Sequence, residues 1–226
     1  MHRVVRWMCV FMWMAGHASA QVPGPVAPAL TPAQIQASQA LAPKYDRSAA
    51  MDQARQATFK DRPVGAIVQK SFDAFANYLI IAAQMMPEPG YSFRPTPDVR
   101  TFGEQINHAT GANYLFCNQA GVPPGFERRN APSLQSVTTK SAIVKALDDS
   151  LAYCSSLIAA ASEAWLLESA PNLGGAGSGR ITGARAYAFI YAGIHGAEDY
   201  GTITTYLRMQ GLVPPSTALV TKSAQD

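Results

Sequence analysis

The chain has 226 residues, of which 48% are hydrophobic, with 18 lysines and arginines against 15 aspartates and glutamates. A chain of this length and apolar content can form one domain with a substantial core. The formal net charge of +3 is small, so the composition argues against an extended basic surface and against nucleic-acid binding.

The first twenty residues have the pattern of a secretory signal peptide. A basic start at residues 1–6 precedes an apolar run at residues 7–15, and Ala18-Ser19-Ala20 is the small-x-small pattern that signal peptidase recognises. The apolar run is too short to span a bilayer. We therefore expect cleavage after Ala20 and a periplasmic or secreted protein without a membrane segment; an uncleaved N-terminal anchor is the alternative.

Removal of this leader changes which residues are left for chemistry. It takes away two arginines, which lowers the net charge to +1. Two histidines remain, His108 and His195, and two cysteines, Cys117 and Cys154. In an oxidising compartment an even pair of cysteines predicts a disulfide, and two buried free thiols are the alternative.

Residues 21–60 are expected to form a flexible or irregular N-terminal extension. Residues 21–31 are rich in proline, alanine and valine and have no periodicity. Thr31 is suited to cap a short helix that begins at Pro32. The segment that follows, as far as Phe59, is polar and only weakly periodic.

Two segments after the extension have a clear helical pattern. The first begins at Pro63, a residue typical of a first helical turn, and ends at Met86 before a Pro-Glu-Pro-Gly cluster. The second begins near Thr101, where Glu104 three residues later completes a capping box. It extends to about Ala120.

Two further helices are predicted in the second half of the chain, at residues 138–164 and 182–209. Residues 121–137 are expected as a loop, and the glycine-rich residues 170–180 as a flexible connection. No stretch alternates in the manner of a β-strand. Four long amphipathic helices predict an all-α four-helix bundle. The bundle is expected over residues 61–216, with a flexible tail at residues 217–226.

The fourth predicted helix carries two candidate ligands. With about 100° of rotation per residue, Asp199 lies near the centre of the apolar face and His195 on its flank. Their i, i+4 spacing lets both side chains reach one ion. A buried carboxylate needs a metal, an ion pair or a hydrogen bond, and Arg208 or a buried tyrosine is the alternative partner. Glu198 points away from this face and is expected as a solvated charge.

The third candidate ligand is His108, on the second predicted helix. The alternative is a histidine at the edge of the core, bonded to a backbone carbonyl. The residues around it resemble the DinB-like (DinB/YfiT-like) family over about residues 60–216. The resemblance is carried by four blocks: Phe93–Gln105 followed by His108, Ala112–Cys117, His195–Tyr206, and a closing segment Leu207–Ser216 that is typical of exported members.

This resemblance implies an up-down-down-up four-helix bundle that holds a divalent ion, often zinc or nickel. The usual ligands are one histidine on the second helix and a His-x-x-x-His pair on the fourth. His108 and His195 match two of these positions, and Asp199 stands in place of the second histidine of the pair. Two histidines and a carboxylate are also a ligand set for zinc or non-haem iron, so iron and manganese are further expectations. The aspartate either changes the metal preference or marks a member that has lost its metal.

The function expected from these residues is that of a metal-dependent transferase or hydrolase acting on an unknown small molecule. Three protein ligands leave coordination positions open, which is the condition for catalysis. Relatives that use low-molecular-weight thiols act in the cytoplasm, so hydrolysis suits an exported protein better. The alternative is a non-catalytic bundle that serves as a binding or dimerisation module. A homodimer is expected because two-fold dimers are the commonest oligomers; nucleic acid and membrane are not expected as partners.

Overall fold

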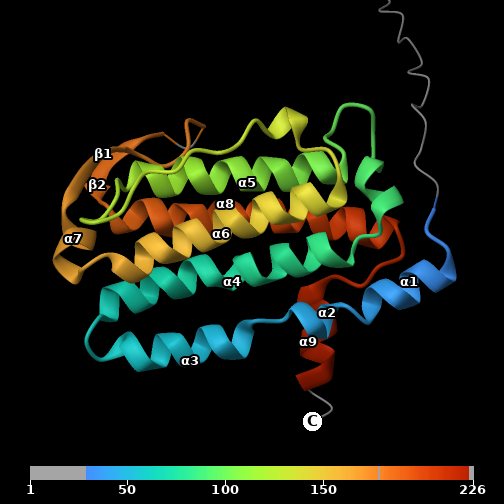
Figure 1. The fold of residues 1–226 in the computed structure, drawn as a ribbon, viewed down its shortest axis with the longest axis horizontal. Helices are drawn as coiled ribbons and strands as arrows, with labels where there is room; N and C mark the ends of the chain where they lie inside the picture. The colour runs from blue at the N-terminus through green and yellow to red at the C-terminus, as the bar shows by residue number, and fades with distance from the viewer. Residues whose placement is uncertain (1–28, 178, 224–226) are drawn as a thin grey trace, which may run out of the picture.

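The computed structural model describes residues 29–177 and 179–223. The expected signal peptide at residues 1–20 and the start of the extension at residues 21–28 lie outside this part. The described chain is mostly helical, as the periodicity predicts. Its four long helices lie side by side with their axes roughly parallel (Figure 1): α4 (Pro63–Met85), α5 (Phe102–Gln119), α6 (Lys140–Ala160) and α8 (Ala186–Met209).

Helices α5 and α6 run in the same direction. Asn113 donates to the Ser150 hydroxyl, and further along both helices the Tyr153 hydroxyl donates to Asn118. An 18-residue helix such as α5 is about 27 Å long. The segment between the two helices therefore has to return along the whole length of α5. It does so as an extended connection that contains one short 3-10 helix, η2 (Leu134–Ser136).

Helices α4 and α8 also run in the same direction. Gly193 of α8 lies against Ser71 of α4. Seven residues further along both helices, Tyr200 stacks on Tyr78 with 5.2 Å between the ring centroids. Their direction is opposite to that of α5 and α6. This is seen where the first residue of α6, Lys140, donates to backbone carbonyls at the end of α4. The four helices thus follow the order up, down, down, up along the chain.

The ends of α4 and α6 bind each other. Arg62, just before α4, donates to the carbonyls of Ile158, Ala159 and Ala161 at the end of α6. Glu163, just after α6, accepts from two backbone N–H groups in the first turn of α4. Terminal N–H and C=O groups of a helix have no partner within the helix, so these contacts satisfy them and fix where the two helices begin and end.

The third long helix ends four residues before the predicted end. Its last residue is Ala160, and the Ser162 hydroxyl caps a separate short helix, α7 (Glu163–Leu167), by accepting from the N–H of Trp165. The continuing apolar pattern suggested one helix, but serine competes for backbone hydrogen bonds and starts a new one.

Two strands are found where the sequence predicts none. The first takes up the start of the connection that was expected to be flexible, and the second takes up the residues where the fourth long helix was expected to begin, so that α8 starts four residues later, at Ala186. The strands β1 (Ser169–Leu173) and β2 (Ile181–Ala184) pair antiparallel. The side chain of Gln119 in α5 both donates to and accepts from the backbone of Gly174, at 3.1 and 2.9 Å. This contact holds the end of β1 against α5. The sequence of the connection itself does not indicate it, because the partner residue lies on another helix.

The N-terminal extension and the C-terminal tail are more helical than expected. The extension contains α1 (Pro32–Gln39), which begins at the predicted residue, followed by α2 (Ala42–Tyr45) and α3 (Ser48–Phe59). The segment expected as a flexible tail forms most of α9 (Pro215–Ser223). Because α2 and α3 contact α4, and α9 contacts both α2 and α4, these short helices gain their stability from packing rather than from their own sequence.

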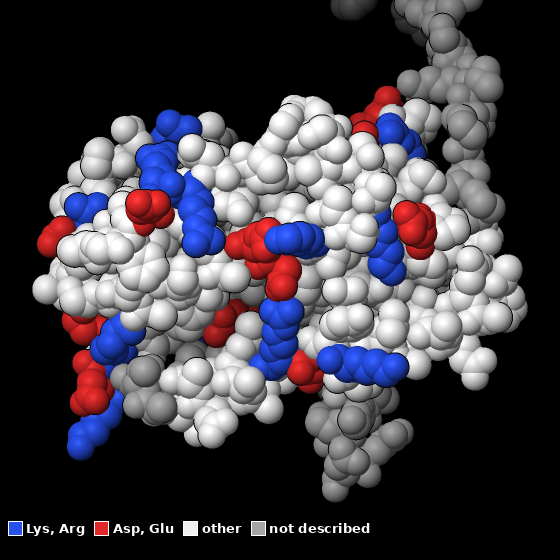
Figure 2. Space-filling view, in the orientation of Figure 1, with Lys and Arg blue, Asp and Glu red and all other residues white. Residues whose placement is uncertain are grey.

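The core lies between the four long helices, and its largest buried side chains include Phe102, Tyr153 and Phe189. On the face drawn in Figure 2, lysines and arginines alternate with aspartates and glutamates. Among the helices of the described part, none is long and apolar enough to cross a bilayer. A second 3-10 helix, η1 (Glu88–Ser92), leads from α4 into the loop that precedes α5.

Candidate metal centre

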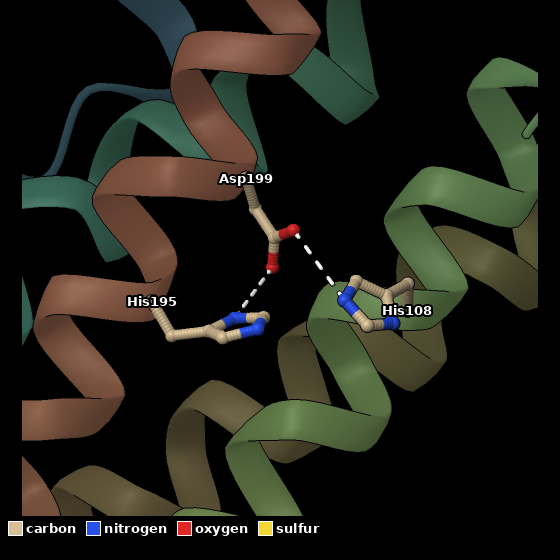
Figure 3. A group of neighbouring side chains, drawn as sticks. All are labelled: His108, His195 and Asp199. Carbon is tan, nitrogen blue, oxygen red and sulfur yellow. Dashed lines mark ion pairs between the residues drawn. The ribbon is translucent and has the colours of Figure 1, made fainter. Parts of the chain in front are cut away.

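The structure brings the three predicted ligands together between α5 and α8 (Figure 3). His108 projects from α5, and His195 and Asp199 project from successive turns of α8. The three ligand atoms lie within 4.8 Å of one another. His195 and Asp199 lie close together because they are one turn apart on α8. His108 lies beside them only because α5 packs against α8.

Asp199 is buried, with 3% of its surface exposed, as its place on the apolar face predicts. The side-chain amide of Gln105, itself 5% exposed, donates to Oδ1 of Asp199 at 2.8 Å. Gln105 on α5 is therefore the hydrogen-bonding partner of this carboxylate, rather than the Arg208 or tyrosine that the sequence suggested. A neutral amide fixes the orientation of the carboxylate without neutralising its charge.

The second oxygen of Asp199 faces His195. Nδ1 of His195 lies 3.0 Å from Oδ2 of Asp199. Both atoms are buried, and neither has a hydrogen-bond partner among the described residues. The contact is therefore a close electrostatic approach rather than an aligned hydrogen bond.

The two histidines have opposite electrostatic environments. The close contact with the Asp199 carboxylate, at hydrogen-bonding distance, is the main cause that raises the pKa of His195 above its ordinary value, and burial acts against it. Burial lowers the pKa of His108, and the Asp199 carboxylate opposes this effect. Nε2 of His108 is 3.9 Å from Oδ1 of Asp199, and the His108 side chain is 36% exposed. His108 thus forms the solvent-facing side of the cluster, and His195 the inner side.

This arrangement fits a bound cation. A buried polar atom without a hydrogen bond is costly and calls for an explanation, of which a bound ion is one. The 3.0 Å separation of Nδ1 and Oδ2 is close to the value of about 3.3 Å between two ligand atoms of a tetrahedral site with bonds of about 2.0 Å. Two imidazole nitrogens and one carboxylate oxygen are donors that suit zinc, iron, nickel or manganese.

Aromatic rings hold the inner histidine in place. The ring of Phe116 on α5 packs on that of His195, with 5.1 Å between centroids, and Tyr191 packs edge-on against Phe116 at 4.9 Å. His108 and His195 are themselves 5.2 Å apart between ring centroids. The rings therefore restrict the rotation of His195, which pre-orients the donor set.

A cavity of about 690 Å³ opens on the cluster, and His108, Asp199 and Gln105 are among its lining residues. Its outer wall is formed by the loop before α5, including Asp98 and Arg100. A second cavity of about 930 Å³ is lined by part of the same loop, including Asp98 and Arg100, and also by His108. A volume of this size accommodates a small-molecule ligand.

Three residues around the site take part in it in ways that the sequence alone does not indicate. Gln105 lies three residues before His108 and therefore on the same face of α5. This spacing is the sequence signal that could have indicated its place beside Asp199. Glu198 is exposed, as expected, but it also lines the cavity. Arg100 and Glu198 both act electrostatically on the two histidines.

A comparison of the chain with models of known families finds no match, and a comparison with curated proteins finds none either. The DinB-like resemblance therefore rests on the residues of the chain itself. These are the segment before His108, the segment after it at Ala112–Cys117, the block His195–Tyr206 and the closing segment Leu207–Ser216.

Proposed function

We propose that this chain is a metal-dependent enzyme of the DinB-like family, with a four-helix bundle of the DinB/YfiT type, acting on a small molecule outside the cytoplasm. The ion is held by His108, His195 and Asp199. The observation that carries the proposal is the cluster of three donors, in which a buried ring nitrogen and a buried carboxylate oxygen face each other without a hydrogen bond.

The family assignment is supported by the directions of the helices. The up-down-down-up order of α4, α5, α6 and α8 is the order that the resemblance implies. The proposed ligands come from the second and fourth of these helices, as they do in the family. The proposed departure is Asp199, which takes the place of a histidine and is accompanied by Gln105 as its hydrogen-bonding partner.

The residues of the chain suit transferase or hydrolase chemistry on a bound substrate. A divalent ion, zinc or nickel in the first place and iron or manganese otherwise, supplies a Lewis acid. Gln105 and Phe116 orient two of the ligands, and the 690 Å³ cavity gives a substrate access to the cluster. An exported location, after cleavage of the leader at Ala20, favours hydrolysis over transfer to a cytoplasmic thiol.

A second candidate is a metal-free bundle that serves as a binding or dimerisation module. It is favoured by the hydrogen bond from Gln105, which already satisfies Oδ1 of Asp199. In this alternative a protonated His195 forms an ion pair with Asp199. The two candidates differ in metal content.

Elemental analysis of untagged protein tests the proposal. We expect about one equivalent of a divalent metal in the wild type and less than a tenth of that in Asp199→Asn or His195→Ala, because a three-ligand site that loses one donor binds weakly. Glu198→Gln is the matched control, since it removes the neighbouring carboxylate from the same helix and should keep the metal.

A wild type that is purified without metal and takes up none of zinc, nickel, iron or manganese would overturn the proposal in favour of the metal-free module. Full retention of metal in Asp199→Asn would instead remove Asp199 from the ligand set.

A further inference from the structure

Arg100, in the loop directly before α5, lines both of the cavities that reach His108. In the 690 Å³ cavity it is the only lysine or arginine among the lining residues that the structure describes. A guanidinium placed at a cavity wall next to a cluster of ligands is a common device for binding an anionic group.

The other cations of the neighbouring cavity already have partners. Arg94 donates to Glu104 and to the carbonyl of Pro97. Lys140 donates to the two carbonyls at the end of α4. For the guanidinium of Arg100, no hydrogen bond or ion pair is found within the described residues. Its five donors are therefore free to bind a ligand.

The backbone of Arg100 is fixed although its side chain is exposed. The hydroxyl of the buried Tyr206 donates to the carbonyl of Arg100 at 2.6 Å. The loop itself is closed by a bond from the N–H of Phe102 to the carbonyl of Phe93 at 2.8 Å. The base of the side chain is thus held in one place, and only the guanidinium has to be ordered when a ligand binds.

The electrostatics agree with this position. The positive charge of Arg100 contributes to the lowered pKa of His108 and opposes the rise in the pKa of His195, so this charge acts on the cluster. Asp98 and Glu198 line the same cavity, and they oppose the accumulation of several negative charges there. A ligand with a single negative charge suits this balance better than a polyanion.

We infer that the substrate is a small molecule with one carboxylate, which Arg100 binds while the rest of the molecule occupies the 690 Å³ cavity toward His108 and Asp199. This inference rests on the proposed function, because the cavity is taken to be the substrate cavity of the metal centre. The planar fork of a guanidinium donates two parallel hydrogen bonds to a carboxylate. Phosphate shares this chemistry, but it carries more charge near neutral pH.

Titrations with simple anions, followed by the amide chemical shifts of the full chain, test the inference. Benzoate carries the carboxylate, benzamide is its neutral analogue of the same shape, and inorganic phosphate is the competing anion. We expect benzoate to shift the amide signals of residues 98–108. Its Kd should increase roughly fivefold or more in Arg100→Gln, in line with the loss of a charge-assisted contact.

Two further variants sharpen the result. Arg100→Lys keeps the charge but loses the fork, so we expect an intermediate Kd. Arg128→Gln is the matched control: Arg128 is an exposed loop arginine that lines neither cavity, and its replacement should leave the Kd of benzoate unchanged.

Several outcomes would overturn the inference. These are equal binding of benzoate to the wild type and Arg100→Gln, equal binding of benzoate and benzamide, or shifts confined to other parts of the protein. Tighter binding of phosphate than of benzoate would exclude the choice of a carboxylate. The failure of the proposed function is seen separately, in the metal content, so the two failures are distinguishable.

Discussion

Asp199 and Asp73 are the two carboxylates that the described core buries, with 3% and 6% of their surfaces exposed. Each accepts a hydrogen bond from a glutamine amide: Asp73 from Gln69 at 2.7 Å and Asp199 from Gln105 at 2.8 Å. A neutral donor lowers the cost of burying the charge without cancelling it. At Asp199 the remaining negative charge faces His108 and His195, so a cation could be bound by all three side chains.

The position of His108 depends on the start of α5, which is fixed by a capping box. The Thr101 hydroxyl accepts from the N–H of Glu104, and the Glu104 carboxylate accepts from the N–H of Thr101 at 2.7 Å. This backbone hydrogen bond is the main reason why the pKa of Glu104 is lowered. A carboxyl group with a lowered pKa stabilises the fold above its ordinary pKa and loses this effect as the pH falls through the folded-state value.

We therefore expect Glu104→Gln to have a lower Tm than the wild type at pH 6, by on the order of 1–2 °C. The difference should shrink as the pH falls through the lowered folded-state pKa of Glu104, where the wild-type carboxylate becomes protonated. Thermal unfolding followed by circular dichroism at a series of pH values measures it. Glu127→Gln, in an exposed loop, is the control, and a gap that is constant or larger at low pH would contradict the capping argument.

Among the elements, α4 and α8 approach each other closely at one glycine. A Cβ atom added at Gly193 would lie 2.3 Å from the carbonyl oxygen of Ser71. Only glycine allows the two backbones to be this close, and the Tyr78–Tyr200 stack lies further along the same interface. The contact sets the position of α8, and with it the positions of His195 and Asp199 relative to α5.

Gly193→Ala should therefore destabilise the protein by about 1–3 kcal/mol, because either the helices separate or the carbonyl of Ser71 has to move. Gly201→Ala is the matched control on the same helix, where an added Cβ meets nothing within 4 Å. It should be neutral or stabilising by up to about 1 kcal/mol, since alanine is the better helix former. Urea unfolding measures both, and equal effects of the two substitutions would disprove the close-packing argument.

At the scale of the whole molecule, a disulfide links the two parallel helices. Cys117 of α5 and Cys154 of α6 are both fully buried, are separated by 37 residues in sequence, and have Cα atoms 5.7 Å apart. The link closes a loop that contains the long connection between α5 and α6. Closing such a loop restricts the unfolded chain and thereby stabilises the folded one.

We expect reduction of this disulfide to lower the free energy of unfolding by about 2–4 kcal/mol. Urea unfolding with and without a reductant measures the difference. The double variant Cys117→Ala/Cys154→Ala should be less stable than the oxidised wild type and insensitive to the reductant. Detection of two free thiols in the unfolded, unreduced protein would show that the bond is absent.

The extents of the first two long helices were determined by local sequence, whereas the predicted third helix was too long at its end and the predicted fourth began four residues too early. The predicted helix at 63–86 is observed as Pro63–Met85, and that at 101–120 as Phe102–Gln119. Periodicity and capping residues act over a few residues, so they can be recognised without the fold. The same holds for the i, i+4 pair of His195 and Asp199, which lies on one helix.

Only the tertiary structure decided which residues meet across helices. The position of the β1–β2 pair against the bundle depends on Gln119 of α5. The hydrogen bond to Asp199 depends on Gln105 of the same helix. Neither partner is marked by a pattern of its own, because a glutamine on a helix has many possible partners until packing selects one. For the same reason the sequence named His108, His195 and Asp199 as candidates, whereas the distances between them, and the place of Arg100 beside them, follow from how α5 packs on α8.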